Sequence, residues 1–297
     1  MIRGLGLALG GGFVRGTAHI GVLKVLEAEG IMPSVIAGTS AGSLVAGLYA
    51  AGWSAKEMEE MAYSLRARDF LDTGLINHLM RLVTYEIGRR FPGMPPQKPP
   101  LGVLPGANLA AFLKKMFGER RFDELKIPLV VTATDIVSGK RVLFMSPSLT
   151  RDEFVPQSNV PVAQAVRASC TVPGLFEPVR IDRQLLVDGS VRETVPAEAA
   201  RWAGAKVVLA VDVGAGGSEN QSVEGLLDIL LESWELAMSE GKRKELEVYA
   251  DSIIKPELMA AGRWDFSKVS HYIKAGEQAA QANLVEITKI LNEFIHN

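Results

Sequence analysis

The chain has one cysteine, four histidines and no long hydrophobic run among its 297 residues. The single thiol, Cys170, excludes an internal disulfide framework and suits a reducing compartment, and we expect it to be buried and unreactive. A formal net charge of -2 argues against broad attraction to nucleic acid, so no nucleic-acid partner is expected.

Membrane-spanning and secretory signals are also missing from the sequence. No stretch approaches the roughly 18 consecutive apolar residues that a membrane span needs. The apolar start breaks into glycines before it reaches the length of a signal peptide. We therefore expect a soluble, cytoplasmic protein, with peripheral contact to a membrane left open.

What is present is typical of an α/β protein with a large core. Apolar residues make up 47% of the chain and charged residues 22%, which argues against wholesale disorder. The start reads as strand (5–9), glycine loop, helix (17–29), strand (35–37), turn and helix, which predicts a parallel sheet covered by helices on both faces. We expect further strands at 129–134, 141–145, 179–181, 185–187, 207–213 and 252–255, and helices at 54–65, 108–117, 161–169, 197–203, 223–249 and 270–294.

The most informative stretch is Gly38-Thr39-Ser40-Ala41-Gly42, which follows apolar β-type residues and precedes small, helix-compatible ones. A strand that ends in Gly-x-Ser-x-Gly is typical of a nucleophile elbow, in which a serine lies at the apex of a sharp turn. The glycines allow close backbone approach there. The alternative is an ordinary Gly/Ser turn between a strand and a helix.

A second glycine-rich turn, Gly10-Gly11-Gly12-Phe13-Val14-Arg15-Gly16, follows the first strand. It departs from the dinucleotide-binding pattern at its last glycine, and no Gly-Lys-Ser/Thr follows it. The better interpretation is an oxyanion hole built from the backbone N–H groups of Gly11, Gly12 and Phe13. Adjacent parallel strands would bring this loop and Ser40 to the same edge of the sheet.

An activated serine needs a base, and none of the four histidines has a convincing setting. His271, at the start of the last helix, is the candidate for an ordinary Ser-His-Asp triad. Asp188, on a turn after an apolar strand and followed by Gly189, is the best-placed carboxylate. A Ser–Asp dyad is chemically adequate where an oxyanion hole carries much of the stabilisation.

The segment 70–105 differs from its surroundings, because it is apolar with interspersed arginines and then rich in proline. The proline density predicts no regular structure over 91–105. It is either a plain surface insertion or a mobile cover that faces a membrane.

The three motifs, in this order, resemble those of the patatin-like phospholipase family, in its bacterial members. Further segments that support the resemblance are 18–23, 132–135 and 167–174, so that it covers about 5–213 of the chain, with a C-terminal helical part over 222–297 outside it. The resemblance implies a three-layer α/β/α fold with a mostly parallel central sheet, in one domain over 1–297.

The resemblance also implies a lipid acyl hydrolase that needs no metal, calcium or other cofactor. Ser40 would be the nucleophile, Asp188 the base, and the Gly11–Phe13 backbone the oxyanion hole, while Arg15 would brace the loop. Two residues depart from the family pattern: Phe13 replaces a glycine, and Ser190 replaces the Gly or Ala usual after Asp-Gly. We expect a lipid or ester substrate; a triad hydrolase using His271 and a non-catalytic lipid-binding protein remain alternatives. The head group, acyl length and oligomeric state do not follow from the sequence.

Overall fold

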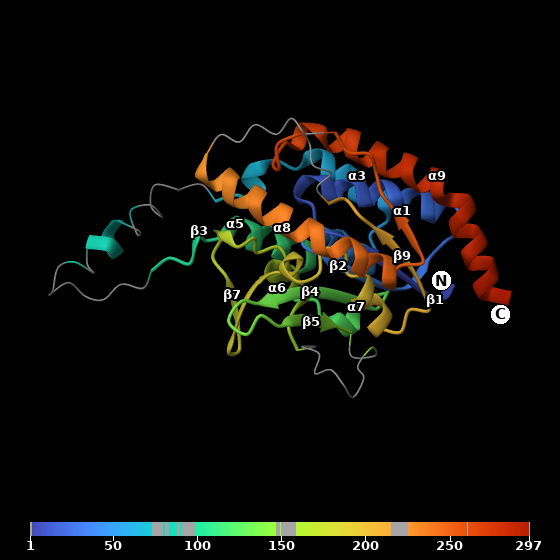
Figure 1. Ribbon diagram of the computed structural model, residues 1–297, viewed down its shortest axis with the longest axis horizontal. Coiled ribbons are helices and arrows are strands. Elements are labelled where there is room, and N and C mark those ends of the chain that lie inside the picture. Colours follow the sequence, from blue (N-terminus) through green and yellow to red (C-terminus); the bar gives the residue numbers. More distant parts are fainter. Residues whose placement is uncertain are drawn as a thin grey trace.

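The computed structural model describes residues 2–72, 80, 83–87, 90, 99–146, 149, 159–214, 225–259 and 261–296. Eight strands of this part form one sheet, in the order β10-β9-β1-β2-β4-β8-β7, with β5 also pairing with β4 (Figure 1). Their bounds are β1 Ile2–Leu9, β2 Pro33–Thr39, β4 Leu129–Asp135, β5 Arg141–Met145, β7 Val179–Ile181, β8 Gln184–Asp188, β9 Val207–Val211 and β10 Ser252–Ile254.

The sheet is mostly parallel, and its register sets the position of both turns predicted to carry chemistry. Strands β10, β9, β1, β2 and β4 run parallel, whereas β5 and β8 are antiparallel to β4. Leu9, the last residue of β1, pairs with Gly38 near the end of β2. The glycine loop and the elbow therefore leave the sheet side by side at its carboxyl edge.

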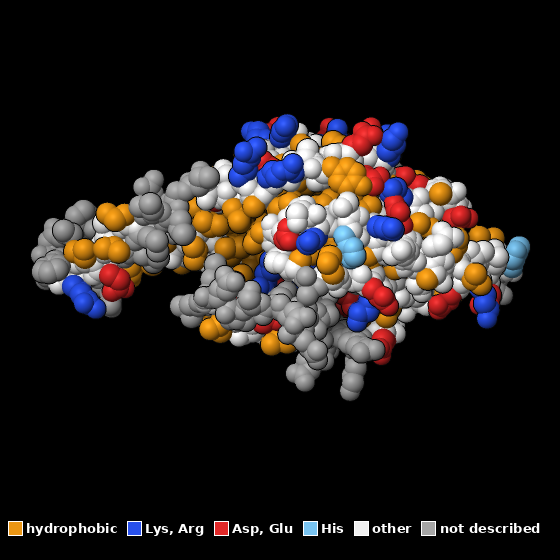
Figure 2. All heavy atoms as spheres, turned by 90° about the horizontal axis from the view of Figure 1, so that it is seen from above, with side chains coloured by type: hydrophobic (Ala, Val, Ile, Leu, Met, Phe, Trp, Pro, Cys, Tyr) orange, Lys and Arg blue, Asp and Glu red, His pale blue; other side chains and the backbone are white. Residues whose placement is uncertain are grey.

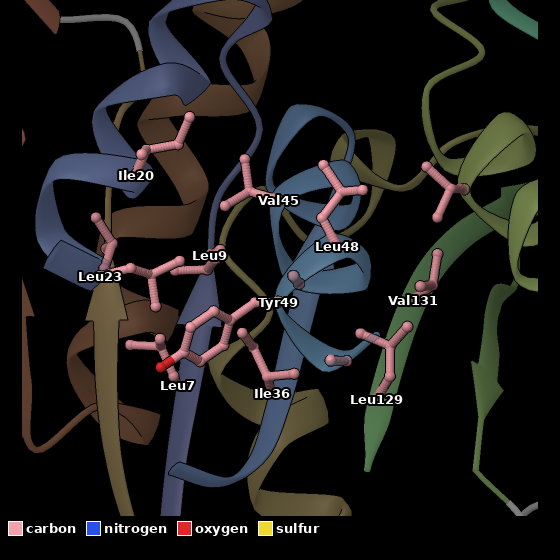
Figure 3. Packing of buried hydrophobic residues seen from close by; sticks show 14 of the residues in the cluster. Leu7, Leu9, Ile20, Leu23, Ile36, Val45, Leu48, Tyr49, Leu129 and Val131 are labelled. Atoms are coloured by element: carbon pink, nitrogen blue, oxygen red, sulfur yellow. The ribbon is translucent and has the colours of Figure 1, made fainter. Parts of the chain in front are cut away.

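Alternation along the strands separates two apolar cores. The odd-numbered leucines of β1, Leu5, Leu7 and Leu9, belong to the larger core, whereas Ala8 faces the smaller one. The larger core packs helices α1, α2, α3, α5, α6 and α9 on one face, and Figure 3 shows Leu7 and Leu9 on the same side of the sheet as Ile20 and Leu23. The smaller core packs α7 and the end of α8 on the opposite face. This is the expected three-layer α/β/α arrangement.

The helices are close to the predicted ranges. The capping box predicted at Ser54 is present, because Ser54 accepts from the N–H of Glu57 and the Glu57 carboxylate accepts from the N–H of Ser54. The α-helices are α1 Ala18–Ala28, α2 Ala41–Ala50, α3 Ala55–Ser64, α5 Ala107–Phe117, α6 Val162–Ser169, α7 Ala197–Trp202, α8 Leu226–Tyr249 and α9 Val269–His296, and the short 3₁₀ helices are η1 Phe13–Thr17, η2 Ala67–Asp69, η3 Phe122–Glu124, η5 Gly189–Val191 and η6 Phe266–Lys268.

One prediction about the proline-rich stretch is wrong. A short strand, β3 (Gly102–Leu104), lies within 91–105 and pairs in parallel with β6 (Gly174–Phe176) as a separate two-stranded sheet. The strand fits between Pro100 and Pro105, so no proline N–H is needed within it. Most of the rest of 70–105 lies outside the described residues.

Candidate active site

Ser40 lies where β2 ends and α2 begins, in a strained backbone conformation. Its φ and ψ are 52° and -125°, a region that residues with a Cβ rarely occupy. Its N–H donates to the hydroxyl of Ser169 at 2.8 Å, and its carbonyl accepts from the N–H of Ser43 at 2.8 Å. The side chain is partly exposed. Strand, strained serine and helix give the backbone geometry that a nucleophile elbow requires.

The glycines on either side of Ser40 are required by close packing. A Cβ on Gly42 would lie 2.1 Å from the carbonyl oxygen of Leu9 in the neighbouring strand. A Cβ on Gly38 would lie 2.5 Å from the Cα of Ser43. Helix α2 can therefore begin directly against the end of β1 only because both positions lack a side chain.

The glycine loop partly agrees with the prediction. Gly10 donates its N–H to the carbonyl of Val211 at 3.0 Å, and Gly11 donates to the carbonyl of Thr194 at 3.0 Å. The N–H of Gly11 is thus already used, so Gly11 does not fit the role of oxyanion donor. Among the described residues, nothing accepts from the N–H groups of Gly12 and Phe13.

Phe13 adopts a φ of 52°, the left-handed region in which a glycine would be unstrained. Its ring packs edge-on against Trp264, with the ring centroids 5.5 Å apart. Trp264 also lies 6.5 Å from the rings of Phe70 and Phe176. An aromatic cluster therefore adjoins the loop and joins it to the start of the 70–105 segment and to β6. The sequence carried no signal for Trp264, which lies in an irregular stretch near α9.

Arg15 contacts the glycine loop and helix α8. Its Nε donates to the carbonyl of Gly12 at 3.3 Å, and its guanidinium forms an ion pair with Glu235 of α8 at 3.1 Å. The following glycine, Gly16, lies against α2, because a Cβ there would come within 2.5 Å of the Cβ of Ala41. Loop and elbow are thus packed directly on each other.

Asp188 ends β8 and is fully buried. Its backbone N–H donates to the carbonyl of Thr171 at 2.8 Å, and its Oδ1 accepts from the N–H of Ser190 at 2.8 Å. Gly189 allows this turn to pass β4, since a Cβ there would lie 2.3 Å from Oγ1 of Thr132. This contact from Ser190 uses a backbone N–H, which any residue at the position would supply.

The structure brings the three motifs together. A Cβ placed on Gly11 would be 3.1 Å from the Cβ of Ser40 and 2.7 Å from the hydroxyl of Ser190, two residues beyond Asp188. The end of α6 supplies a further link, because Ser169 accepts from Ser40 and Thr171 accepts from Asp188. Elbow, glycine loop and Asp188 turn therefore converge at one edge of the sheet.

Neither His19 nor His271 fits the role of base. His271 is exposed on α9, where its ring lies 6.1 Å from that of Tyr272. His19 is fully buried, and its Nε2 must carry a proton because it lies 2.7 Å from the carbonyl oxygen of Gly10. Desolvation lowers the pKa of His19 to about 4, so the ring is neutral and holds the glycine loop. His78 lies outside the described residues.

Cys170 lies beside the site without the character of a nucleophile. Burial raises the pKa of its thiol to about 12, and the charge of Asp188 acts in the same direction. Among the described residues, no group of three or more His, Cys, Asp and Glu side chains is placed to hold a metal ion.

Sequence reasoning missed the polar residues behind the site. The hydroxyl of Thr39 lies 2.7 Å from that of Thr132 and donates to the carbonyl of Glu193 at 3.1 Å. The buried Glu193 carboxylate pairs with Arg141 of β5 at 2.6 Å and accepts from the N–H of Ala199 at the start of α7. Burial raises the pKa of Glu193, against the opposing effect of Arg141. No local pattern indicates this network, because its members are far apart in the sequence.

Comparisons with known proteins agree with the motifs. The sequence model of the patatin-like phospholipase family matches residues 7–201. The human patatin-like phospholipase domain-containing protein 6 is 31% identical over 261 residues, which cover 86% of this chain and 16% of that protein. An uncharacterised NTE family protein of Mycobacterium tuberculosis is 32% identical over 213 residues, which cover 72% of this chain and 49% of that protein. The chain thus spans half or less of the length of these relatives.

Solved structures with a similar arrangement include VipD from Legionella pneumophila, with a TM-score of 0.48 and 15% identity over 96% of this chain and 67% of that one. Human GIVD cytosolic phospholipase A2 has a TM-score of 0.48 and 12% identity over 98% of this chain and 59% of that one. The family match spans both glycine motifs and the Asp188 turn. On this evidence the chain belongs to the patatin-like phospholipase family.

Proposed function

We propose that this chain is a serine acyl hydrolase that cleaves carboxylic esters of lipids, with Ser40 as nucleophile and Asp188 as base. The observation that carries the proposal is the convergence of a strained elbow serine, a glycine loop with unused N–H groups and a buried aspartate at one sheet edge. Family membership supports a lipid ester as substrate, and a relative from Yarrowia lipolytica is named a lysophospholipase.

The reaction follows from these groups. The hydroxyl oxygen of Ser40 attacks the ester carbonyl while its proton passes to the Asp188 carboxylate, which forms a tetrahedral intermediate. The N–H groups of Gly12 and Phe13 donate to the oxyanion. The C–O bond to the alcohol then breaks, and the alcohol leaves with the proton from Asp188. Water adds to the acyl-serine in the same way and releases the fatty acid.

The surroundings of the glycine loop favour an apolar acyl group. Phe13, whose N–H would face the oxyanion, carries a ring that packs on Trp264, which in turn meets Phe70 and Phe176. This aromatic cluster lies directly beside the proposed reaction centre. An acyl chain bound along it would bury apolar surface at about 25 cal/mol per Å², which we infer as the source of the preference for lipid esters.

The proposal is tested by intact mass after exposure to a fluorophosphonate, together with hydrolysis of a short p-nitrophenyl ester. We expect one adduct in the unmodified protein and none in Ser40→Ala. We expect hydrolysis to fall by about a thousandfold or more in both Ser40→Ala and Asp188→Asn, because each removes a group that acts in the chemical step.

The alternatives give different results in the same assay. His271→Ala should retain near-normal turnover, because His271 is exposed on α9; its loss of activity would instead support a triad. Folded protein that neither forms an adduct nor hydrolyses the ester would contradict the proposal and favour the non-catalytic lipid-binding reading. Circular dichroism of each variant checks that the fold is intact.

A further inference from the structure

A network of two arginines and two glutamates joins helix α8 to the glycine loop. The guanidinium of Arg263 pairs with Glu232 at 2.5 Å and with Glu235 at 2.6 Å, and both acids lie on α8. Glu235 also pairs with Arg15 at 3.1 Å, and the Nε of Arg15 donates to the carbonyl of Gly12 at 3.3 Å. Glu235 therefore joins Arg263 to the guanidinium that contacts the glycine loop.

The network is largely shielded from water. The side chains of Arg263 and Glu235 are each 9% exposed, and that of Arg15 is 12% exposed. The adjacent residues Trp234 and Trp264 pack against the larger core. Figure 2 shows hydrophobic side chains gathered at the end of the molecule where α8 begins in Figure 1. Ion pairs with little access to water are stronger than pairs on an open surface, so this network can hold the loop in one conformation.

The carbonyl that Arg15 contacts belongs to the same peptide unit as the N–H of Phe13, the proposed oxyanion donor. A trans peptide is planar, so its C=O and its N–H point in opposite directions. The hydrogen bond from Arg15 to the carbonyl of Gly12 therefore fixes the direction of the Phe13 N–H. Whatever holds Arg15 in place also sets the orientation of this donor.

The conformation held in this way is strained, because Phe13 has a φ of 52°. Rotating the peptide between Gly12 and Phe13 by about half a turn would return this φ to negative values, which residues with a Cβ prefer. The rotation would also put the carbonyl oxygen of Gly12 where the N–H now lies, and that oxygen would repel an oxyanion. The active orientation therefore needs support from outside the loop, which a glycine at position 13 would need far less.

The segment that carries Arg263 contacts the loop directly as well. The carbonyl of Arg263 accepts from the N–H of Val14 at 3.4 Å, and its guanidinium lies 5.9 Å from the centroid of the Phe13 ring. The ring of Trp264 packs edge-on against the same ring. The strained residue is thus held through its ring, through the peptide before it and through the peptide after it. Glu235 contacts both of the guanidinium groups involved.

We propose that Glu235 is a positioning residue of the oxyanion hole, which orients Arg15 and, through it, the N–H of Phe13. The inference rests on the proposed function for the role of that N–H, but not for its orientation. Glu235 lies beyond residues 7–201, which the family model matches, so the motifs do not contain it. The ring at position 13 and the acid on α8 therefore form one device, in which the acid supports the strain that the ring-bearing residue introduces.

The first test is the kinetics of Glu235→Gln on a short p-nitrophenyl ester. Glutamine keeps the size of the side chain and removes the charge that pairs with both guanidinium groups. We expect kcat to fall about tenfold, because the peptide can then rotate and relieve the strain at Phe13. KM should stay within about twofold of the parent value, because the donor acts on the oxyanion rather than on the bound ester.

Two further variants separate positioning from a general loss of stability. In a Phe13→Gly background the strain is absent, so adding Glu235→Gln should lower kcat by no more than about twofold. Glu232→Gln removes the same charge from the same helix but leaves Arg15 paired with Glu235, so its kcat should stay near that of the parent. Equal falls for Glu235→Gln in both backgrounds, or an equal fall in Glu232→Gln, would overturn the proposal.

A spectroscopic readout does not depend on turnover. The sequence contains a single Gly-Phe pair, Gly12-Phe13. Isotope labels in the carbonyl of glycine and the nitrogen of phenylalanine therefore give one carbonyl-correlated amide signal in the NMR spectrum of the full chain. Glu235→Gln should displace or split this signal, and Glu232→Gln should leave it in place.

The NMR signal and the kinetics together keep the two proposals apart. A signal that does not move in Glu235→Gln would overturn the positioning role, even if kcat fell. A parent protein that neither hydrolyses the ester nor reacts with a fluorophosphonate would contradict the proposed function. If Glu235→Gln still displaced the signal in such a protein, the orientation of the Phe13 N–H by Glu235 would be supported on its own.

Discussion

At the scale of single residues, the candidate site combines backbone strain with groups that hold it. Ser40 and Phe13 both have a φ of 52°, a conformation that costs roughly 1–2 kcal/mol for a residue with a Cβ. At Ser40 hydrogen bonds stabilise the strained conformation. Its N–H donates to the hydroxyl of Ser169, and its carbonyl accepts from the N–H and the hydroxyl of Ser43. Ser169 and Ser43 therefore position the proposed nucleophile through its backbone.

His19 gives a prediction about pH and stability. Its pKa falls from 6.5 to about 4 in the folded chain, so the neutral ring is favoured there. Because the unfolded chain takes up the proton first, the free energy of unfolding falls as the pH drops below 6.5. The stabilising contribution of neutral His19 is fully present above pH 6.5 and is lost by about pH 4. The shift corresponds to about 3 kcal/mol. Urea unfolding over this range should show that loss in the parent protein.

The matched variant is His19→Gln, which keeps a donor for the carbonyl of Gly10 and cannot titrate. Between pH 6.5 and about 4, the free energy of unfolding of this variant should fall by about 3 kcal/mol less than that of the parent. Parallel pH profiles for the two proteins would show that His19 is not the titrating group.

Residues whose role depends on sequence-local geometry could be predicted, and residues whose role depends on distant partners could not. The elbow needs only a strand, two glycines and a serine within five positions, and Ser40 is found as predicted. Arg15 could be assigned to the loop, but its partner Glu235 lies 220 positions away. Nothing local marks Glu193 or Trp264, and the N–H of Gly11 donates to the carbonyl of Thr194, which no motif contains.

At the scale of elements, helices α1 and α9 pack unusually close through two glycines. A Cβ on Gly276 would lie 1.9 Å from the carbonyl oxygen of Ala18, and one on Gly21 would lie 1.9 Å from that of Ile273. A methyl group at either position forces the two helices apart. We expect Gly276→Ala to lower the free energy of unfolding by about 2–3 kcal/mol, measured by urea denaturation.

The control for this substitution is Gly262→Ala, because a Cβ at Gly262 would meet nothing within 4 Å and its φ is not in the left-handed region. Its unfolding free energy should stay within about 0.5 kcal/mol of the parent value. If Gly276→Ala were as stable as this control, the close approach of α1 and α9 would not hold in solution.

The bounds of helices and strands with strong periodicity can be predicted to within a few residues, whereas the pairing of strands cannot always be predicted. The strand predicted at 141–145 is β5 with the same bounds, and its antiparallel pairing with β4 is confirmed. Strand β3 is three residues between prolines, and it forms because β6 offers a partner more than sixty positions later. Such a strand has no periodicity to detect, because its stability comes from the partner strand.

At the scale of the whole molecule, we propose that the described chain folds as one domain. Strand β10 joins the sheet begun by β1, and α9 packs on α1 across nearly the full length of the sequence. The ring of Phe294 lies against Gly4, and the two ends of the chain lie near each other in Figure 1. The C-terminal helical part, which no motif covers, is therefore built into the core.

The segment 73–105 leaves the core through a stem, by which we mean the place where its two ends are joined by hydrogen bonds. The Asp72 carboxylate accepts from the N–H groups of Gly106 and Asn108 at 2.5 and 2.9 Å, so the two ends of the 73–105 segment meet. Arg167, buried beneath β6, donates to the carbonyls of Pro105 and Gly106 at 3.1 and 3.2 Å. The stem is thus held by core residues rather than by the segment it carries.

We therefore expect the core to tolerate replacement of 73–98 by a linker of about eight Gly and Ser residues, which spans up to roughly 26 Å. Shortening a loop changes its closure free energy by only about 0.6 kcal/mol per halving, so the melting temperature should hardly change.

Hydrolysis of a soluble short-chain ester should persist, since Ser40 and Asp188 lie in the core. If the segment contacts membranes, hydrolysis of vesicle lipids should fall far more than that of the soluble ester. An equal loss on both substrates would show that the insertion supports the reaction centre itself rather than its approach to a lipid surface.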